Sequence, residues 1–393
     1  MSLKVAIAGG GIGGLAGALA VSRGGCNVVL FEKTAAFTEI GAGIQLGPNV
    51  ARIFDAWGLL DDLRKVATAP ERLQVRSAAD AGLLGELRLG QTIAARYGAP
   101  YLTLHRADFH SVLLNAVNQT AALVQINCSV QNFQQTAQTI CLQTSHGQQD
   151  ADVLAGADGL WSNTRQQLIN DGLPRRTGHL AYRALVKQTD LPPALRSQNI
   201  TAWLGPNMHA IQYPVRGGDL LNVVVFIHGD VPDDFQNWNH SANAADLKVA
   251  LQGICIELND LLHAVPDWRL WVMHDRPPMQ GAHQHAQGRV ALLGDAAHPM
   301  RPYLAQGAGM AIEDAAELGL ALKGANSQNV PAALQHYAAN RWQRNARVQA
   351  RSLRNGQIFH ATGPVRWGRD VAIKLMGERL LDMPWLYGYR RLT

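Results

Sequence analysis

A carboxylate at the junction of a strand and a glycine-rich stretch is the first feature of the sequence that suggests chemistry. Within residues 290–309, a strand-like run, "VALLGD", ends at Asp295, and Gly307 and Gly309 follow where a helix begins. Ligands of doubly wound sheets bind at the carboxyl ends of strands, and the amides at a helix start attract anionic groups. The pattern predicts a large ligand against Asp295, with both glycines bare to admit it.

A second glycine pattern opens the chain, in "KVAIAGGGIGGLAGALAVSRGGCNVVLFEK". Gly9, Gly11 and Gly14 fill a GxGxxG motif, whose glycines permit a tight turn, close approach of a pyrophosphate, and close helix–strand packing. Glu32 ends the next strand, where a carboxylate accepts hydrogen bonds from a ribose hydroxyl. A glycine-rich turn without a ligand does not explain Glu32. We therefore expect these residues and the neighbouring Lys33 to contact a dinucleotide.

The segment that follows favours FAD over NAD as this dinucleotide. An NAD dehydrogenase would continue with further strand–helix repeats, whereas "GAGIQLGPNVARIFDAWGL" is a loop that enters a helix. Gly41 and Gly43 are not needed for a helix, so we expect this loop to pass close to something flat. The apolar residues of the helix recur at helical spacing and are expected in the core: Val50, Ile53, Phe54 and Trp57.

Three motifs in series carry a resemblance to a known family. They are the GxGxxG at Gly9–Gly14, the pair Asp158-Gly159 and the pair Gly294-Asp295. Their order and separation resemble those of the class A flavoprotein aromatic hydroxylases over nearly the whole chain. Within that class, "GAGIQLGPN", "HRADFH", "GDAAHPM" and "AQGAGMAIEDA" are most similar to the hydroxylases of hydroxybenzoates and of 6-hydroxynicotinate. The resemblance implies an α/β fold, with a Rossmann-like FAD-binding domain, an antiparallel β-sheet substrate domain and a C-terminal helical tail.

The resemblance also implies which residues would hold the flavin of a non-covalently bound FAD. Asp295 would hold the ribityl hydroxyls, and the amides of Gly307 and Ala308 would face the N1/O2 edge of the isoalloxazine. Partial positive charge at a helix start would stabilise the reduced ring. Gln45, in "GAGIQLGPN", would lie beside the flavin.

Two further residues are implied at the nucleotide side. Arg106, which heads a helix in "HRADFH", would reach the nucleotide part of FAD, although a charge at the end of a surface helix is the alternative. Asp158 would support both FAD and a passing nicotinamide nucleotide. Because no second GxGxxG occurs, NADH or NADPH is expected to bind transiently and leave.

On the substrate side, the resemblance places an aromatic molecule between the β-sheet domain and the flavin. The implied catalytic residues are His209, Tyr213 and Tyr303. His209 and Tyr213 are four residues apart in "MHAIQYP", so they share one face of a strand; a hydrogen-bonded core pair is the alternative. The 6-hydroxynicotinate enzyme has histidines where Gln45 and Tyr303 stand, whereas Gln45 matches the hydroxybenzoate enzymes.

Two other polar residues have competing interpretations. Arg183, in "YRAL", could meet a carboxylate or the nicotinamide, or it could be an ordinary charge at a sheet edge. His298, next to the "GDAA" turn, is interpreted as a hydrogen-bonded turn histidine.

The implied function is that of an FAD-dependent monooxygenase that consumes NAD(P)H and O2 and hydroxylates a small aromatic acid or phenol. Tyr213 or His209 would take the phenolic proton, which raises electron density ortho and para to the oxygen. Three alternatives stay open. They are an FAD oxidase or dehydrogenase, a non-catalytic binding protein on the same fold, and a hydroxylase or epoxidase of a non-phenolic or N-heterocyclic substrate.

These motifs require three structural units. Short β-rich runs separated by Gly, Pro and Asp, such as "LLNVVVFIHG", mark the substrate unit. The tail is expected to be helical, with little functional content beyond packing or a dimer surface. The expected boundaries are 1–72, 101–174 and 276–330 for FAD binding, 73–100 and 175–275 for the substrate, and 331–393 for the helical region.

Composition limits the remaining classes of function. The formal net charge is +5, and the one basic cluster, at 341–354, is interpreted as the solvated face of a helix instead of a nucleic-acid patch. The four cysteines lack a metal-ligand pattern, so no metal site is expected. No apolar run is long enough to span a membrane, and no leader segment is recognisable. We expect a cytoplasmic monomer or homodimer.

Overall fold

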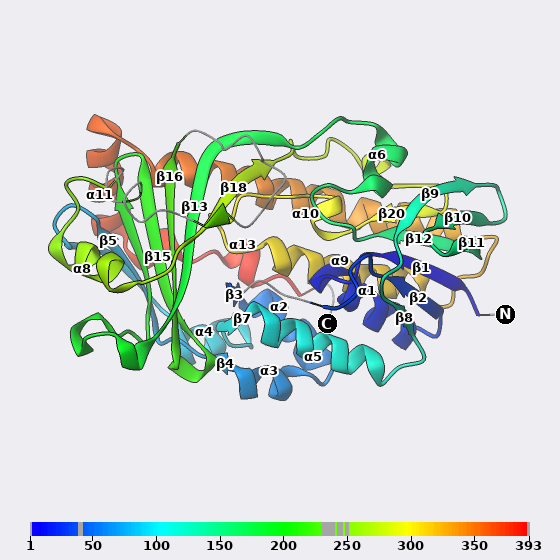
Figure 1. Cartoon of the computed structure of the whole chain (residues 1–393), viewed down its shortest axis with the longest axis horizontal. Coiled ribbons are helices and arrows are strands. Elements are labelled where there is room, and N and C mark those ends of the chain that lie inside the picture. The colour runs from blue at the N-terminus through cyan, green and yellow to red at the C-terminus, as the bar shows by residue number, and fades with distance from the viewer. Residues whose placement is uncertain (1, 38–41, 230–239, 242–246, 248–250, 391–393) are drawn as a thin grey trace.

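Two sheets of different construction lie toward opposite ends of an elongated molecule (Figure 1). The computed structural model describes residues 2–37, 42–229, 240–241, 247 and 251–390. The long helix α10 (Val330–Phe359) runs alongside both sheets. The predicted α/β class is confirmed, and the cavity described below lies between the two ends.

The first sheet is parallel except at one edge. Its order is β19-β20-β12-β1-β2-β8, and only the β19–β20 pair is antiparallel. Its strands read as apolar runs, such as "KVAIA", because helices cover them. Helix α1 (Ile12–Arg23) packs against α9 (Gly307–Leu322) and α5 (Arg106–Asn118). The strands are β1 (Lys4–Ala8), β2 (Asn27–Phe31), β8 (Leu123–Gln125), β12 (Val153–Gly156), β19 (Ala286–Gln287) and β20 (Val290–Leu292).

The second sheet has the order β17-β18-β13-β16-β15-β14-β5-β6 and is antiparallel, as predicted, apart from the parallel pair β14–β5. Alternate residues face opposite sides. Val223 and Val225 pack toward α8 (Ile256–Ala264), whereas Val224 and Phe226 face the cavity. The strands are β5 (Arg72–Ser77), β6 (Leu83–Arg88), β13 (Arg175–Lys187), β14 (Ile200–Gly205), β15 (Met208–Val215), β16 (Leu220–His228), β17 (His240–Ser241) and β18 (Arg269–Asp275).

Smaller elements connect these units. In α2 (Pro48–Ala56), Val50, Ile53 and Phe54 are buried as predicted, and Trp57 just after its end is half-buried. Among the described residues, no helix is long and apolar enough to cross a membrane. The remaining strands are β3 (Gly43–Leu46), β4 (Ala67–Thr68), β7 (Leu102–His105), β9 (Val130–Gln135), β10 (Ile140–Thr144) and β11 (Gly147–Ala151). The remaining helices are α2 (Pro48–Ala56), α3 (Leu60–Val66), α4 (Gly90–Tyr97), α6 (Asn163–Ile169), α11 (Gly363–Met376), α12 (Glu378–Leu381) and α13 (Pro384–Tyr387).

The basic cluster on α10 is not the solvated helix face that the sequence predicted. Arg341 is fully buried, and its guanidinium donates to Glu313 at 2.9 Å and to Asp314 at 2.7 Å, both on α9. Arg344 donates to Glu313 at 2.6 Å, and Arg351 lines the cavity. Arg347 and Arg354 are exposed as predicted. The prediction was wrong for the other three arginines because α10 packs between other elements, and opposite charges on α9 compensate the burial of Arg341 and Arg344.

Candidate active site

A cavity of about 920 Å³ separates the first sheet from the second. Its walls come from the loop after β1, the segment around β3, the start of α9, the inner face of the second sheet and the end of α10. Sites for drug-sized ligands and cofactors span roughly 300–1,000 Å³, so this volume admits a large ligand.

The three glycines of the first motif serve different purposes. Gly9 has φ +104°, and a Cβ there would lie 2.5 Å from the carbonyl oxygen of Ala157. A Cβ on Gly14 would lie 1.8 Å from the carbonyl oxygen of Gly9. A Cβ on Gly11 would meet nothing within 4 Å, and Gly11 lines the cavity. Gly9 and Gly14 are therefore required by the turn itself, whereas the bare backbone at Gly11 faces the ligand space.

Glu32 is buried beneath this turn. Its carboxylate accepts hydrogen bonds from the amide of Gly10 at 2.7 Å and from the amide and hydroxyl of Thr34 at 2.8 and 2.9 Å. Glu32 thus ties the end of β2 to the glycine turn. The side chain of Lys33 is exposed and lies outside the cavity lining.

Asp158 shapes the turn after β12. Its carboxylate accepts hydrogen bonds from the Ser162 hydroxyl at 2.5 Å and from the amide and hydroxyl of Thr164, both at 2.9 Å. These bonds satisfy groups at the start of α6, where the first amides lack partners within the helix. The cavity is lined here by the neighbouring Gly159 and Leu160. The structure thus places the Asp158 side chain against α6 and its neighbours toward the ligand space.

Asp295 follows β20 and is exposed to the cavity, although protein surrounds it. This enclosure raises the pKa of its carboxyl, and the nearby His298 and Arg106 oppose the shift. Within the described ranges, no residue donates a hydrogen bond to this carboxylate. An enclosed carboxylate without donors is costly to maintain, so Asp295 is suited to accept hydrogen bonds from the hydroxyl groups of a ligand.

The start of α9 meets the cavity at Gly307 and Ala308. A Cβ on Gly307 would approach only Met300, at 4.0 Å. A Cβ on Gly309 would instead lie 3.0 Å from Val50 and 2.9 Å from Gln306, so this glycine is bare because of protein packing, contrary to the prediction. The first turn of α9 holds no acidic residue, and its amides leave partial positive charge facing the cavity.

Arg106 and Gln45 also line the cavity. Arg106 is the first residue of α5, where the helix dipole disfavours a cation. This position, and its half-burial, argue against the alternative of a surface end charge. The side-chain oxygen of Gln45 accepts a hydrogen bond from the Tyr101 hydroxyl at 2.7 Å. Gln45 therefore stands in the wall, held in one orientation.

Tyr213 and His209 project from β15 into the same cavity. Burial raises the pKa of Tyr213 to about 12, while Arg183 and a hydrogen bond with Gln45 oppose the rise. Burial lowers the pKa of His209 well below its usual value, and His360 and His179 add to this shift. At neutral pH the phenol is protonated and the imidazole is neutral.

The structure shows why Gly43 has no side chain, in the loop that was expected to pass close to a flat group. A Cβ there would lie 2.5 Å from Cε2 of Tyr213, and the Gly43 amide donates to the Asn222 side chain at 2.7 Å. The flat group beside this glycine is thus the Tyr213 ring. Gly41 lies outside the described residues.

Arg183 lies on β13, an interior strand between β16 and β18. The sheet-edge interpretation was therefore wrong. Its guanidinium stacks on the Trp271 ring, with Cζ 4.0 Å from the ring centroid, and lines the cavity. Burial lowers the pKa of Arg183 to about 10, so it remains a cation at neutral pH. In the part of the chain that the structure describes, its Nε has no hydrogen-bond partner.

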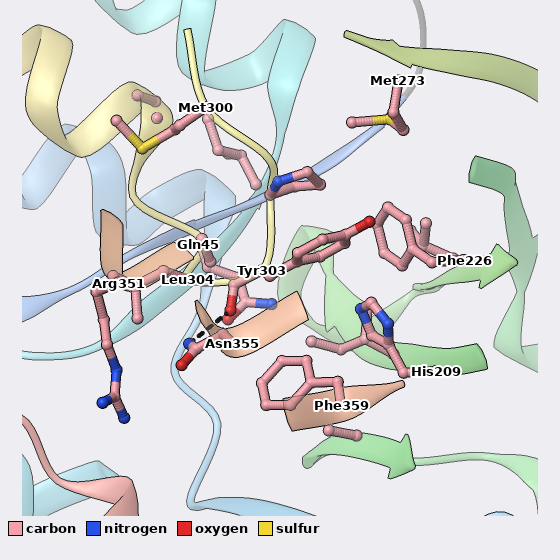
Figure 2. Close-up of a pocket in the computed structure, with 18 of the residues that line it drawn as sticks. Gln45, His209, Phe226, Met273, Met300, Tyr303, Leu304, Arg351, Asn355 and Phe359 are labelled. Atoms are coloured by element: carbon pink, nitrogen blue, oxygen red, sulfur yellow. Dashed lines mark hydrogen bonds between the residues drawn. The ribbon is translucent and has the colours of Figure 1, made fainter. Parts of the chain in front are cut away.

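Tyr303 contributes its ring to the site. Figure 2 shows it beside Phe226, His209 and Phe359, and its ring centroid lies 4.9 Å from that of His209. Its hydroxyl is hydrogen-bonded to Nδ1 of His179 at 2.8 Å. Burial raises the pKa of Tyr303. The hydroxyl is thus engaged by the second sheet, and the ring forms an apolar wall of the cavity.

The sequence analysis missed the contribution of α10. Arg351, Asn355 and Phe359 line the cavity, and Asn355 donates to the backbone oxygen of Tyr303 at 3.0 Å (Figure 2). The C-terminal region is therefore part of the site, contrary to the expectation of little functional content. The available signal in the sequence was the helical spacing of the apolar residues Leu334, Tyr337, Ala338 and Val348, which lie on the buried side of α10.

His298 is the hydrogen-bonded turn residue that its position suggested. It is buried, and its Nε2 pairs with the carboxylate of Asp314 on α9. The same carboxylate receives the Gly294 amide at 3.0 Å and the Arg341 guanidinium. This network fixes the turn that presents Asp295 to the cavity.

Comparisons with known proteins agree with this geometry. Residues 2–352 match the family model described as an FAD binding domain. The chain is 38% identical to a 3-hydroxybenzoate 6-hydroxylase of Polaromonas naphthalenivorans (strain CJ2), over 98% of this chain and 96% of the relative. It is 34% identical to a 6-hydroxynicotinate 3-monooxygenase of Bordetella bronchiseptica, over 88% and 89%. A salicylate hydroxylase solved as a substrate complex superposes with a TM-score of 0.85 and 28% identity, over 99% of this chain and 96% of that one.

The residues present fit FAD. The backbone at Gly11 faces the cavity with no side chain in the way, and the Asp295 carboxylate accepts no hydrogen bond from the described residues. The amides at the start of α9 have no side-chain cap and no acidic residue in the first turn. The rival of a binding protein without a flavin leaves these three features unexplained. The fold, the cavity and the family match lead to one conclusion: the chain belongs to the FAD-binding-domain family, and it is a flavin-dependent monooxygenase of the aromatic-hydroxylase type.

Proposed function

We propose that this protein uses NADH or NADPH and O2 to hydroxylate a phenolic aromatic acid of the hydroxybenzoate class. One observation carries the proposal. A half-buried cation, Arg183, a protonated phenol, Tyr213, and a neutral imidazole, His209, all line the same cavity from one sheet face. A substrate that carries both a carboxylate and a phenolic hydroxyl would satisfy all three groups.

Arg183 is the group we assign to the carboxylate. Arginine presents a planar fork of N–H donors that matches the two oxygens of a carboxylate. The Trp271 ring holds the guanidinium in place, and its Nε has no protein partner among the described residues. Arg183 has no counter-ion within the described ranges, and a partly buried cation in that state is unfavourable, so substrate binding would relieve that cost.

His209 and Tyr213 are the groups we assign to the phenolic hydroxyl. Nδ1 of His209 is engaged by His360 at 2.6 Å, which leaves Nε2 to accept the phenolic proton. The Tyr213 hydroxyl would orient the substrate oxygen by a hydrogen bond. Loss of the proton raises electron density on the ring at the positions where an electrophilic oxygen attacks. Apolar walls that include Phe226, Phe359 and the Tyr303 ring would keep water from the reacting atoms.

The cofactor would be held at the other end of the cavity. When bound, FAD supplies the redox chemistry, in which electrons from NAD(P)H are used to activate O2. Asp295, Arg106 and Gln45 would contact it through side chains. Backbone contacts would come from Gly11, Gly307 and Ala308. Gly9, Gly14, Glu32 and Asp158 would act by shaping the turns, and Lys33, which is exposed outside the lining, stays a predicted contact of the nucleotide.

A substrate screen tests the proposal. Purified enzyme with FAD would be mixed with NADH or NADPH and 3-hydroxybenzoate, salicylate or 6-hydroxynicotinate, and the products analysed after reaction under ¹⁸O2. We expect a hydroxybenzoate to stimulate nicotinamide oxidation and to gain one ¹⁸O atom. 3-Hydroxybenzamide, which lacks the carboxylate charge, is the matched control and should stimulate far less. Nicotinamide oxidation that yields only hydrogen peroxide with every phenolic acid would contradict the proposal.

A further inference from the structure

Four histidines gather between the cavity and the surface of the second sheet. His179 lies on β13, His209 on β15 and His228 on β16, and His360 caps the end of α10. Their rings are in contact, with the His360 centroid 4.9 Å from that of His209 and 5.0 Å from that of His228. We call these residues the histidine cluster. Three elements of the sheet and the last turn of α10 must come together to form it.

Hydrogen bonds order three members of the cluster into a chain. Nδ1 of His209 lies 2.6 Å from Nε2 of His360, and Nδ1 of His360 lies 2.9 Å from Nε2 of His228. His209 is buried and lines the cavity, whereas His228 is exposed. The chain therefore leads from the cavity to the solvent through two ring-to-ring hydrogen bonds.

The protonation state of the chain suits proton transfer. Burial lowers the pKa of His360 to about 3, with additional lowering by His179, His228, Arg301 and Arg369. Burial also lowers the pKa values of His209 and His228. Each imidazole is thus neutral at pH 7 and carries one N–H donor and one lone pair. A neutral imidazole can accept a proton at one nitrogen and release one from the other.

A metal site is the other reading of this cluster, because ligand nitrogens of His179, His228 and His360 lie within 4.8 Å of one another. Two observations argue against it. His179 stacks on His360 with ring planes 24° apart, so their in-plane lone pairs do not converge on a point. The Arg301 guanidinium lies 3.3 Å from Nε2 of His179 and would repel a cation. The hydrogen-bonded order favours protons.

We propose that His360 and His228 relay to solvent the phenolic proton that His209 accepts. The inference rests on the proposed function, which assigns His209 to the substrate hydroxyl. The substrate O–H bond breaks and a proton binds Nε2 of His209. The Nδ1 proton of His209 passes to Nε2 of His360, the Nδ1 proton of His360 passes to Nε2 of His228, and the Nδ1 proton of His228 passes to water. One proton enters, one leaves, and each ring changes tautomer.

The relay answers a difficulty in the site. Burial destabilises the imidazolium form of His209, so a proton taken from the substrate would not remain on this ring. His209 can therefore act on the substrate efficiently only if its other nitrogen delivers a proton onward. His360 provides that acceptor at 2.6 Å.

The test uses His360→Gln, which keeps hydrogen-bonding groups but cannot change tautomer. His336→Gln, at an exposed position on the same helix, is the matched control. Holoenzyme would be mixed with 3-hydroxybenzoate in weakly buffered solution containing a pH indicator, and the rate of proton release measured by stopped flow. Hydroxylation would be measured in parallel. We expect His360→Gln to slow proton release at least 10-fold, with substrate Kd within about threefold, and His336→Gln to match wild type.

Two further arms separate the explanations. Added imidazole should restore proton release to His360→Ala, a rescue that a purely structural role of His360 would not predict. His228→Gln should slow proton release by a smaller factor than His360→Gln, because water can replace an exposed group at the end of the chain. Proton release in His360→Gln within twofold of wild type overturns the relay. One equivalent of tightly bound zinc in purified wild type that His360→Gln abolishes also overturns it. Proton release that depends on His360 without any hydroxylated product overturns the proposed function and leaves the relay standing.

Discussion

The two ends of the cavity are built in different ways. At the end that we assign to FAD, the groups proposed to recognise the cofactor are mainly backbone amides and bare glycines, supplied by short local motifs such as Gly9–Gly14 and the start of α9. At the end that we assign to the aromatic substrate, the lining groups are side chains from separate elements, including Arg183 on β13, Tyr213 on β15 and Asn355 on α10. The first end is a property of local chain geometry, and the second is a property of how the sheets and α10 pack.

This difference predicts how substitutions at each end of the cavity affect the protein. A change to the turn glycines forces the backbone itself to move, because the nearest atoms are backbone atoms that cannot rotate away. A change at the aromatic end leaves the fold intact and alters protonation or charge in a formed cavity. Four substitutions test this distinction.

The largest effect is expected from Gly14→Ala, because its Cβ would lie 1.8 Å from the Gly9 carbonyl oxygen. We expect a loss of unfolding free energy of about 3 kcal/mol and no retained FAD, measured by thermal unfolding and flavin absorbance. Gly11→Ala is the matched control, since its Cβ meets nothing within 4 Å. It should fold normally and bind FAD more weakly. If the two variants are equally stable, Gly14 is not required by the turn in the way that the structure indicates.

Tyr213→Phe should act on chemistry alone. Misplacement of a reacting group by about 1 Å can cost on the order of 100-fold in rate. Because the substrate oxygen would lose its orienting hydrogen bond, we expect hydroxylation to slow by about 100-fold while the flavin spectrum and FAD content stay unchanged. The reaction under single-turnover conditions, compared by product analysis, is the measurement. An unchanged hydroxylation rate removes Tyr213 from the mechanism, and loss of FAD would show that the two ends are not independent.

Arg183→Gln should weaken substrate binding and spare the cofactor. Charged hydrogen bonds are worth roughly 1.5–3 kcal/mol, so we expect KM for 3-hydroxybenzoate to rise by about 50-fold. KM for 3-hydroxybenzamide, which carries no charge, should change by less than about threefold on the same reasoning. If both substrates lose affinity equally, Arg183 shapes the cavity and does not bind a carboxylate.

Asp295→Asn should give the smallest effect, since the amide keeps one acceptor oxygen. We expect FAD to dissociate about 10-fold more readily, which corresponds to about 1.4 kcal/mol. Fluorescence titration of the apoprotein with FAD measures this change. Hydroxylation at saturating FAD should return to near the wild-type rate. Wild-type FAD affinity in this variant would mean that the carboxylate does not contact the cofactor.

Much of the FAD end could be predicted because its information is local. The spacing from Gly9 to Gly14 describes one turn between β1 and α1, and Glu32 and the pair Gly294-Asp295 each follow directly after a strand of the same sheet. A turn of that kind leaves few backbone solutions. The exception is Gly309, where the bare position serves contacts with Val50 and Gln306 that sequence spacing does not reveal.

The aromatic end could be predicted only in part. His209 and Tyr213 share a strand face, so period-two geometry places them together. The hydroxyl of Tyr303, by contrast, bonds to His179, which lies 124 residues away. Arg183 was ambiguous because its strand order in the sheet, and hence its edge or interior position, depends on pairings between distant segments.

The sequence by itself determined the glycine motif after β1 and the shared face of His209 and Tyr213 on β15, because each follows from spacing within one or two elements, and the α/β class followed from the family resemblance that its motifs carry. Only the tertiary structure decided that Arg341 is buried, that the Asp158 carboxylate accepts the Thr164 amide at the start of α6, and that His360 reaches His209. The physical reason is common to all three. Whether a polar side chain faces water, a helix start or another side chain depends on which element packs over it, and that is set by contacts between residues far apart in the chain.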